Sequence, residues 1–214
     1  MNVRLLQITV AWLVSVAVGC TSAPVRYYTL TVPPDKALSA SETTLVIDVR
    51  IVLTPRQLNR AELMVRTGPS EVTLLENERW ASPVSDEIKE ALRLELKRRL
   101  PRGFTYAYAR LTLDIDVQRL EAELGRYALI EASWRATLFS MGERSNGAPT
   151  IACTFQANEK IQPGYAGMVE GYQRQIGALA DAIVAALTSP AGGSDPACQK
   201  SIEELAGGPG SKNH

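Results

Sequence analysis

The sequence predicts an α+β fold in which two amphipathic helices pack on one face of a mixed, largely antiparallel sheet. Short segments with alternating apolar residues lie both before and after one long amphipathic segment, and a second helix-periodic segment closes the folded part. Hydrophobic residues make up 45% of the chain, which favours a folded body over a disordered one. We therefore expect a single domain at residues 27–189.

The first part of this domain is expected to contain four strands. Each candidate is rich in β-branched, aromatic or alternating apolar residues and is bounded by proline, glycine or a polar loop such as residues 35–42. Gly68-Pro69 separates the last two, as in two strands joined by a turn. The expected strands are residues 26–32, 45–53, 63–66 and 72–75.

A helix follows. Ser82 suits its cap, Pro83 its first turn, and Asp86 and Glu87 the positive end of its dipole. We interpret the basic residues 97–99 as partners of the helix C-terminus, and Pro101 ends the helix. One apolar stripe has four-residue spacing: Val84, Ile88, Leu92, Leu96 and Leu100.

The remaining segments predict an antiparallel meander covered by a second helix. Apolar and polar residues alternate along each main strand, and helical spacing returns from Met168 to Leu187. From Pro190 onward the chain is rich in Gly, Ser and Pro, so we expect a flexible tail at 190–214. The expected strands are a short one at 104–108 and longer ones at 111–117, 130–138 and 151–161.

The N-terminus has the layout of a lipoprotein signal peptide at residues 1–19. Arg4 precedes an apolar run of about 14 residues, shorter than the roughly 20 that a membrane-spanning helix needs. Gly19 suits the cleavage position before Cys20, whereas Ala17 departs from the usual leucine. We therefore interpret Cys20 as the lipidated residue and 20–26 as the tether. Two or more acyl chains on Cys20 would anchor the protein firmly. The alternative is an ordinary secretory signal that leaves Cys20 free or disulfide-bonded.

The charge balance bears on which partners the protein can bind, and the cysteines bear on whether it contains a disulfide. The chain has 23 basic and 23 acidic side chains, and removal of residues 1–19 removes only Arg4 among them. This balance does not suit a nucleic-acid partner. An exported protein meets an oxidising compartment, which permits a disulfide between Cys153 and Cys198. Cys153 also lies in an alternating apolar pattern, so a buried free thiol is the competing interpretation.

Enzymatic chemistry finds little support, and we expect no enzyme, cofactor or metal site. The one histidine, His214, is the last residue and lies in the expected tail. The phosphate-binding Gly-x-x-x-x-Gly-Lys motif and the nucleophile motif Gly-x-Ser-x-Gly are absent from the sequence. Asp114 and Asp116 share one face of a strand, and we interpret them as a solvated sheet face beside Arg119.

Several residues are candidates for a partner-protein interface. Trp and Arg are common anchors of interfaces, although a Trp beside a helix start usually closes the core, which is the interpretation we favour for Trp80. The segment with Tyr27 and Tyr28 is either an edge strand that pairs with a partner or, as we favour, the first core strand. The candidates are Tyr27, Tyr28, Arg60, Arg66, Arg79 and Trp80.

The order and spacing of these segments resemble the ABC-transporter auxiliary lipoproteins of the PqiC type, also called the YmbA family. Gln57 departs from the tyrosine or phenylalanine that the family often has there. The resemblance extends to about Thr188. The matching segments are Cys20 followed by residues 26–30, then residues 55–66, residues 78–83 with the helix after them, residues 113–117, and the closing helix with Tyr172.

This resemblance implies a non-catalytic lipoprotein at the periplasmic face of the outer membrane. It would be an accessory subunit of an intermembrane lipid transport system that contains an MCE-domain (PqiB-like) protein, and it would itself form homo-oligomers. Thr21 after the cysteine is consistent with outer-membrane sorting. Two alternatives are a structural or assembly lipoprotein that binds another envelope protein, and direct cargo binding between helices and sheet.

Overall fold

The computed structural model describes residues 23–33, 45–56, 58–101, 108–140, 148–189 and 198–201. The expected signal peptide at 1–19, Cys20, Gln57, the expected loop at 35–42 and most of the expected strand at 104–108 lie outside the described residues. The α+β class is confirmed. The elements are β1 (Arg26–Tyr28), β2 (Val46–Leu53), β3 (Glu62–Gly68), β4 (Glu71–Trp80), α2 (Val84–Arg99), β5 (Tyr108–Glu123), β6 (Tyr127–Ser140), β7 (Thr150–Lys160), α4 (Gly164–Thr188) and β8 (Cys198–Ser201).

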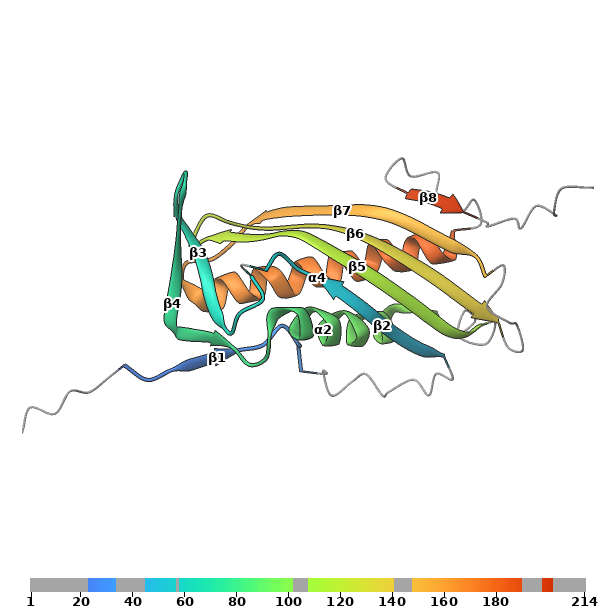
Figure 1. The fold of residues 1–214 in the computed structure, drawn as a ribbon, viewed down its shortest axis with the longest axis horizontal. Helices are drawn as coiled ribbons and strands as arrows, with labels where there is room; N and C mark the ends of the chain where they lie inside the picture. The colour runs from blue at the N-terminus through green and yellow to red at the C-terminus, as the bar shows by residue number, and fades with distance from the viewer. Residues whose placement is uncertain are drawn as a thin grey trace, which may run out of the picture.

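The strands form two sheets. Sheet B has the order β2-β5-β6-β7-β8, and sheet A has the order β1-β4-β3. Sheet B is antiparallel except that β2 runs parallel to β5, and in sheet A β1 runs parallel to β4. Figure 1 shows sheet B as the long body of the molecule and the β3–β4 hairpin standing at one end of it. The division into two sheets did not follow from the alternating patterns, which specify strands and not their partners.

The meander of sheet B follows from the alternation in the sequence. Leu111, Leu113 and Ile115 are at most 2% exposed, and they face the helices. The turn between β5 and β6 places Gly125 at φ 72°, a left-handed conformation in which glycine carries no steric penalty. One face of the sheet packs on the helices and the other faces water. The strands therefore alternate apolar and polar residues and are not apolar at every position.

Both helices lie side by side on one face of sheet B (Figure 1). All five residues of the predicted stripe on α2 are buried. Pro83, and not Ser82, occupies the N-cap position, and the Ser82 hydroxyl instead donates to Glu87 Oε1 at 2.8 Å. At the other end of α2, Arg99 Nε donates to Asp181 Oδ1 of α4 at 2.7 Å, so this basic end joins the two helices.

Helix α4 approaches the sheet closely at Gly171. A Cβ at this position would lie 2.5 Å from Cγ2 of Ile161, which is closer than carbon atoms pack. Beside it, buried Gln175 donates to the carbonyl oxygen of Ala128 at 2.6 Å. A Cβ at Gly171 would require Ile161 or the helix to shift, so glycine permits this close approach of α4.

Strand β1 is shorter than the expected strand at 26–32. After Tyr28 the chain leaves sheet A, and the Leu30 side chain enters the core, where it is 1% exposed. The Leu30 N–H donates to a carboxylate of α2 rather than to a neighbouring strand. This side-chain acceptor ends the strand, and no local pattern announces it.

Strand β8 corrects part of the flexible-tail prediction for 190–214. Residues 198–201 pair antiparallel with the edge of β7, with Cys198 opposite Cys153, and the two cysteines form a disulfide. Cys153 is also 5% exposed, so the core position and the disulfide coexist. The strand escaped prediction because its four residues have no apolar alternation.

Candidate functional site

The candidate interface residues, which are scattered along the sequence, gather around sheet A. Tyr27 and Tyr28 lie on β1, Arg66 on β3, and Arg79 on β4 with Trp80, while exposed Arg60 precedes β3. The parallel register places Tyr27 opposite Arg79 and Tyr28 opposite Trp80. Because side chains alternate across a strand, these residues divide between an inner and an outer face of sheet A.

The inner face holds a buried carboxylate, Glu78, that binds β1. Arg26 Nε donates to Glu78 Oε1 at 2.9 Å, and the Tyr28 hydroxyl donates to Oε2 at 2.7 Å. Glu78 is 5% exposed, so these partners replace the water that its charge has lost. The Arg26 guanidinium also lies 5.9 Å from the ring centroid of Tyr165 at the start of α4. Glu78 thereby joins β1 to β4, and Arg26 extends this contact to α4.

A second buried carboxylate, Glu87 of α2, holds the residues just after β1. Its Oε2 accepts from the Thr29 hydroxyl at 2.7 Å and from the Leu30 N–H at 2.9 Å, and its Oε1 accepts from Ser82. From α4, Gln173 Nε2 donates to the Thr29 carbonyl oxygen at 3.0 Å. We call the interactions of Glu78, Glu87 and Gln173 with residues 26–30 the β1 clamp. It fixes the start of the folded chain to both helices and to β4.

The outer face of sheet A carries the exposed candidates. Tyr27 is 66% exposed and Val25, two residues earlier, is 42% exposed. Arg79 beside Tyr27 donates through Nε to the Glu76 carbonyl oxygen at 3.1 Å, and its Nη2 lies 3.5 Å from Glu62 Oε1. We call Val25, Tyr27 and Arg79 the outer patch. Trp80 belongs instead to the core, where it is 5% exposed and its ring centroid lies 6.4 Å from that of Tyr172.

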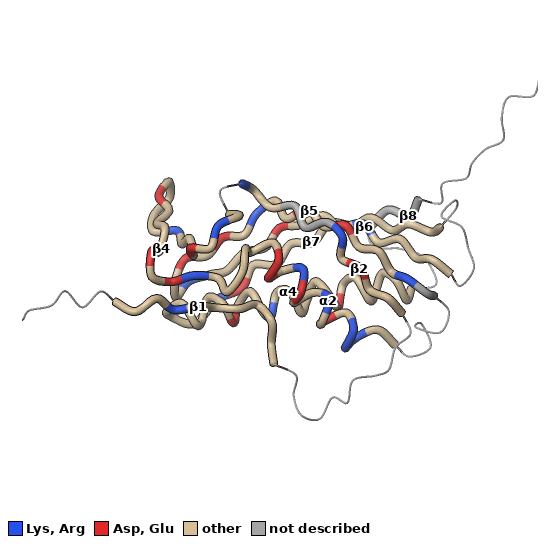
Figure 2. The backbone as a smooth tube through the Cα atoms, turned by 60° about the horizontal axis from the view of Figure 1, so that its bottom comes forward, with Lys and Arg blue, Asp and Glu red and all other residues tan. Residues whose placement is uncertain are grey.

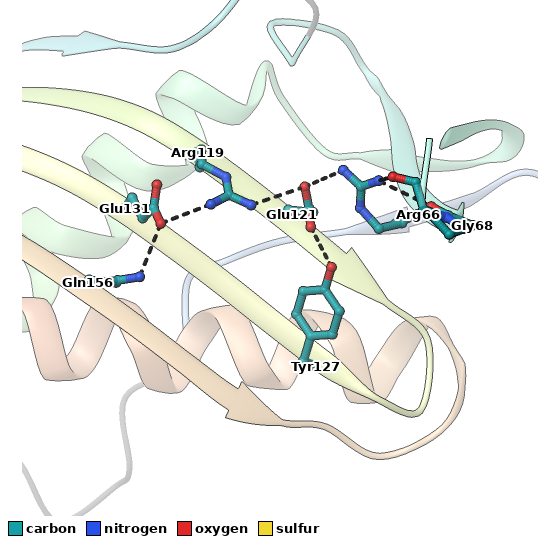
Figure 3. A network of polar contacts seen from close by, with 8 residues as sticks. Arg66, Gly68, Arg119, Glu121, Tyr127, Glu131 and Gln156 are labelled. Carbon is teal, nitrogen blue, oxygen red and sulfur yellow. Dashed lines mark hydrogen bonds and ion pairs between the residues drawn. The ribbon is translucent and has the colours of Figure 1, made fainter. Parts of the chain in front are cut away.

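Arg66 connects the hairpin to sheet B. Its Nη2 donates to Glu121 Oε2 of β5 at 2.7 Å, and its Nη1 donates to the carbonyl oxygens of Gly68 at 3.1 Å and Pro69 at 2.9 Å. Glu121 also accepts from the Tyr127 hydroxyl (Figure 3). The hydrogen bond from Arg66 is the main reason that the pKa of Glu121 falls from its ordinary 4.5 to about 2. Arg66 is therefore occupied within the protein.

This network continues along the surface of sheet B. Arg119 lies 3.6 Å from Glu121 and donates to Glu131 at 3.0 Å, and Gln156 donates to the same Glu131 oxygen at 3.1 Å (Figure 3). In the view of Figure 2, acidic and basic residues are interspersed over these elements and do not separate into fields of one sign. Such pairing suits a structural surface and provides no field for an anionic polymer.

Comparison with known proteins decides the family. A sequence profile described as ABC-type transport auxiliary lipoprotein component matches residues 28–184, which run from the last residue of β1 through β7 and most of α4. The chain belongs to this family. The resemblance to PqiC-type lipoproteins is thus confirmed.

Two solved structures align with this auxiliary lipoprotein. A crystal structure of an uncharacterized protein aligns with a TM-score of 0.54 and 18% identity, over 76% of this chain and 97% of that one. A DUF330-family protein from Xanthomonas campestris aligns with a TM-score of 0.49 and 17% identity, over 76% and 95% of the two chains. No curated protein matches the sequence. At such identities the first alignment shows a shared fold only.

Two hollows in the described part of the auxiliary lipoprotein lie beside the β3–β4 hairpin. A cavity of about 20 Å³ lies where Trp80 and Tyr172 meet Leu120 and Met168, which is room for about one water molecule. An acyl chain does not fit in this cavity. An open groove of about 260 Å³ lies between the hairpin and β5, with Met64, Val72 and Leu120 in its lining, and Arg66 and Glu121 beside them.

The described residues of the auxiliary lipoprotein contain no group of three His, Cys, Asp or Glu side chains placed to hold a metal ion. Asp114 lies 3.6 Å from Arg50 of β2, and Asp116 is exposed on the same face of β5. Neither described helix is long and apolar enough to cross a membrane.

From the sequence, we did not single out Glu78 and Glu87 as functional residues. Their only signal was their position beside Trp80 and in the first turn of a helix.

The Arg66–Glu121 pair predicts a specific response to acid. A lowered folded-state pKa means that the pair stabilises fully above about pH 4.5, and that this contribution is lost as the pH falls through about 2. We expect Glu121→Gln to lower the free energy of unfolding by about 1–2 kcal/mol at pH 7, and the deficit to vanish near pH 2. Urea denaturation at a series of pH values measures this. Glu71→Gln, at an exposed residue of the β3–β4 hairpin that carries Arg66, is the control. A deficit for Glu121→Gln that stays constant with pH would contradict the assignment.

Proposed function

We propose that this protein is a non-catalytic lipoprotein of the outer membrane that serves as an accessory subunit of an MCE-type intermembrane lipid transport system. Membership in the transport auxiliary lipoprotein family is the observation that supports this most. Beyond family membership, we propose that the protein lies at the periplasmic face of the outer membrane and docks with an MCE-domain protein. We propose that it does so as a homo-oligomer.

The β1 clamp supports a docking role. Only five residues, 21–25, separate Cys20 from β1, so the two are at most about 20 Å apart along an extended chain. Since Glu78 and Glu87 hold residues 26–30 to the body, the domain has little freedom to reach across the periplasm. A partner has to come to the membrane to meet it. The cavity beside Trp80 and Tyr172 has room for about one water molecule, so a lipid chain is not carried in it.

A cross-linking experiment tests the proposal. The acylated full chain is cross-linked in intact cells and captured, and we expect the MCE-domain protein as the main cross-linked partner. Deletion of the gene should expose phospholipid on the outer surface of the cell. If the deletion disturbs an envelope assembly while phospholipid asymmetry stays intact, and cross-links lead only to other envelope proteins, the alternative of a structural lipoprotein replaces the proposal.

The role of Cys20 gives a separate prediction. With residues 1–19 replaced by a conventional cleavable secretory signal and Cys20→Ala, the domain should move almost entirely from the membrane fraction to the soluble periplasmic fraction, because its acyl chains are its anchor. The control carries the signal of another lipoprotein and retains Cys20. Mass spectrometry of the N-terminal peptide reports acylation. An unmodified peptide in a membrane-bound control would contradict the prediction.

A further inference from the structure

We propose that the outer patch, Val25 and Tyr27 with Arg79 beside them, lies against the surface of the membrane that holds the lipid anchor. The inference rests on the proposed acylation of Cys20. Its subject is the orientation of the domain on the membrane, which neither the family nor the fold assigns. The occupant of the patch is therefore a lipid surface, and contact with a partner protein is the competing outcome.

The exposure pattern of β1 gives the first argument. Residues alternate along the strand, so that Arg26 and Tyr28 face Glu78 while Tyr27 faces away, and Val25 just before the strand is exposed as well. Val25 at 42% and Tyr27 at 66% are two of the six large hydrophobic residues that are exposed in the described part of the chain. They are the two that lie next to the predicted anchor.

The length of chain before the patch gives the second argument. Four residues, 21–24, separate Cys20 from Val25, so at full extension the two are about 17 Å apart. If the acyl chains of Cys20 are in the bilayer, Val25 cannot move farther than this from the headgroup region. Exposed apolar side chains held so close to a lipid surface gain free energy by entering its interfacial layer.

The β1 clamp gives the third argument, because it makes the patch rigid. Glu78 binds two side chains of β1, and Glu87 binds Thr29 and the Leu30 N–H. The patch therefore cannot peel away from the body to satisfy the anchor. Figure 1 shows β1 at one end of the long axis of the molecule, whereas β2 begins toward the other end. Membrane contact at β1 consequently orients the whole domain.

The chemistry of the patch suits a lipid headgroup layer. A tyrosine places its ring among the upper acyl carbons and its hydroxyl among the headgroups, and arginine extends to phosphate while its stem stays in apolar surroundings. Tyr27 and Arg79 are cross-strand partners, so they present these two groups together. The guanidinium Nη2 of Arg79 lies 3.5 Å from Glu62, a loose ion pair whose side chains are 37% and 26% exposed, and phosphate can replace it.

Depth-dependent fluorescence quenching tests the proposal. The acylated full chain, carrying Tyr27→Cys labelled with nitrobenzoxadiazole, is inserted into vesicles of phosphatidylethanolamine and phosphatidylglycerol that contain lipid with a spin label near the headgroup. Val46→Cys is the matched control, because Val46 is 56% exposed at the start of β2. We expect the emission from position 27 to fall severalfold more than the emission from position 46.

Each result decides the matter. Equal quenching at positions 27 and 46 overturns the proposal, as does quenching at 27 by an aqueous quencher alone. If the label at 27 responds only after an MCE-domain protein is added, the patch is a protein interface. The vesicles contain no partner protein, so the quenching result does not depend on whether the proposed role in lipid transport is correct. Mass spectrometry of the vesicle-bound protein reports acylation separately, and its absence would overturn both proposals.

Discussion

Replacement of Cys198 by alanine is expected to lower the free energy of unfolding by about 4 kcal/mol. The disulfide to Cys153 closes a loop with a sequence separation of 45, and the entropy of such a loop in the unfolded chain corresponds to about 4 kcal/mol. Cys198→Ala leaves the buried Cys153 side chain in place, so core packing around β7 changes little. Equilibrium urea denaturation of the mature protein under oxidising conditions measures the loss.

Reduction of the native protein supplies the matched control for this variant. Dithiothreitol should lower the stability of the native protein to that of Cys198→Ala and should leave the variant unchanged. Because β8 has four residues at the edge of sheet B, we also expect faster amide exchange along the β7 edge that β8 covers. If the oxidised native protein and Cys198→Ala unfold at the same urea concentration, the cross-link does not stabilise the native fold.

The second large effect is expected at Glu87. Glu87→Ala removes the acceptor of the Leu30 N–H and of the hydroxyls of Thr29 and Ser82. The Leu30 N–H is buried and loses its partner, while the hydroxyls turn to water. We therefore expect a loss of about 3 kcal/mol in the free energy of unfolding, with amide exchange at residues 26–31 increasing most.

Two variants separate this clamp from a general effect of charge. Glu87→Gln keeps one oxygen for the Leu30 N–H and turns its amide toward Ser82, so it should cost only about 1 kcal/mol. Glu90→Ala removes an exposed glutamate of the same helix that pairs with Arg93, and should cost less than about 0.5 kcal/mol. Equal losses for Glu87→Ala and Glu90→Ala would show that the buried carboxylate does not hold the chain.

The clamp and the disulfide act at different ends of the domain. The clamp joins the start of the domain to β4 and to both helices, and the disulfide attaches the last described strand to sheet B. Loss of the clamp should therefore disturb how the domain stands on its anchor, whereas loss of the disulfide should spare it. We expect the label at position 27 to be quenched equally in the Cys198→Ala variant and in the labelled protein that retains Cys198.

The candidate site shows how far local patterns carry. Tyr27 and Arg79 were singled out separately, and the parallel pairing of β1 with β4 makes them neighbours. Arg66 was a candidate for a partner-protein interface, and its acceptor proved to be Glu121, 55 residues away. Glu87 was interpreted only as a partner of the helix dipole, yet it is 5% exposed and binds the segment after β1. The pairing of distant strands brings these groups together, and this pairing cannot be inferred from the residues next to each of them in the sequence.

The sequence by itself determined the α+β class, the apolar stripe of α2 and the inward residues of the meander. These features have periods of 3.6 or 2 residues, so burial of one face dictates them locally. The tertiary structure alone decided the division into two sheets, the parallel partners of β1 and β2, the pairing of β8 and the burial of Glu78 and Glu87. Strands of similar pattern can pair in several orders, and a carboxylate can be buried only where distant donors converge on it.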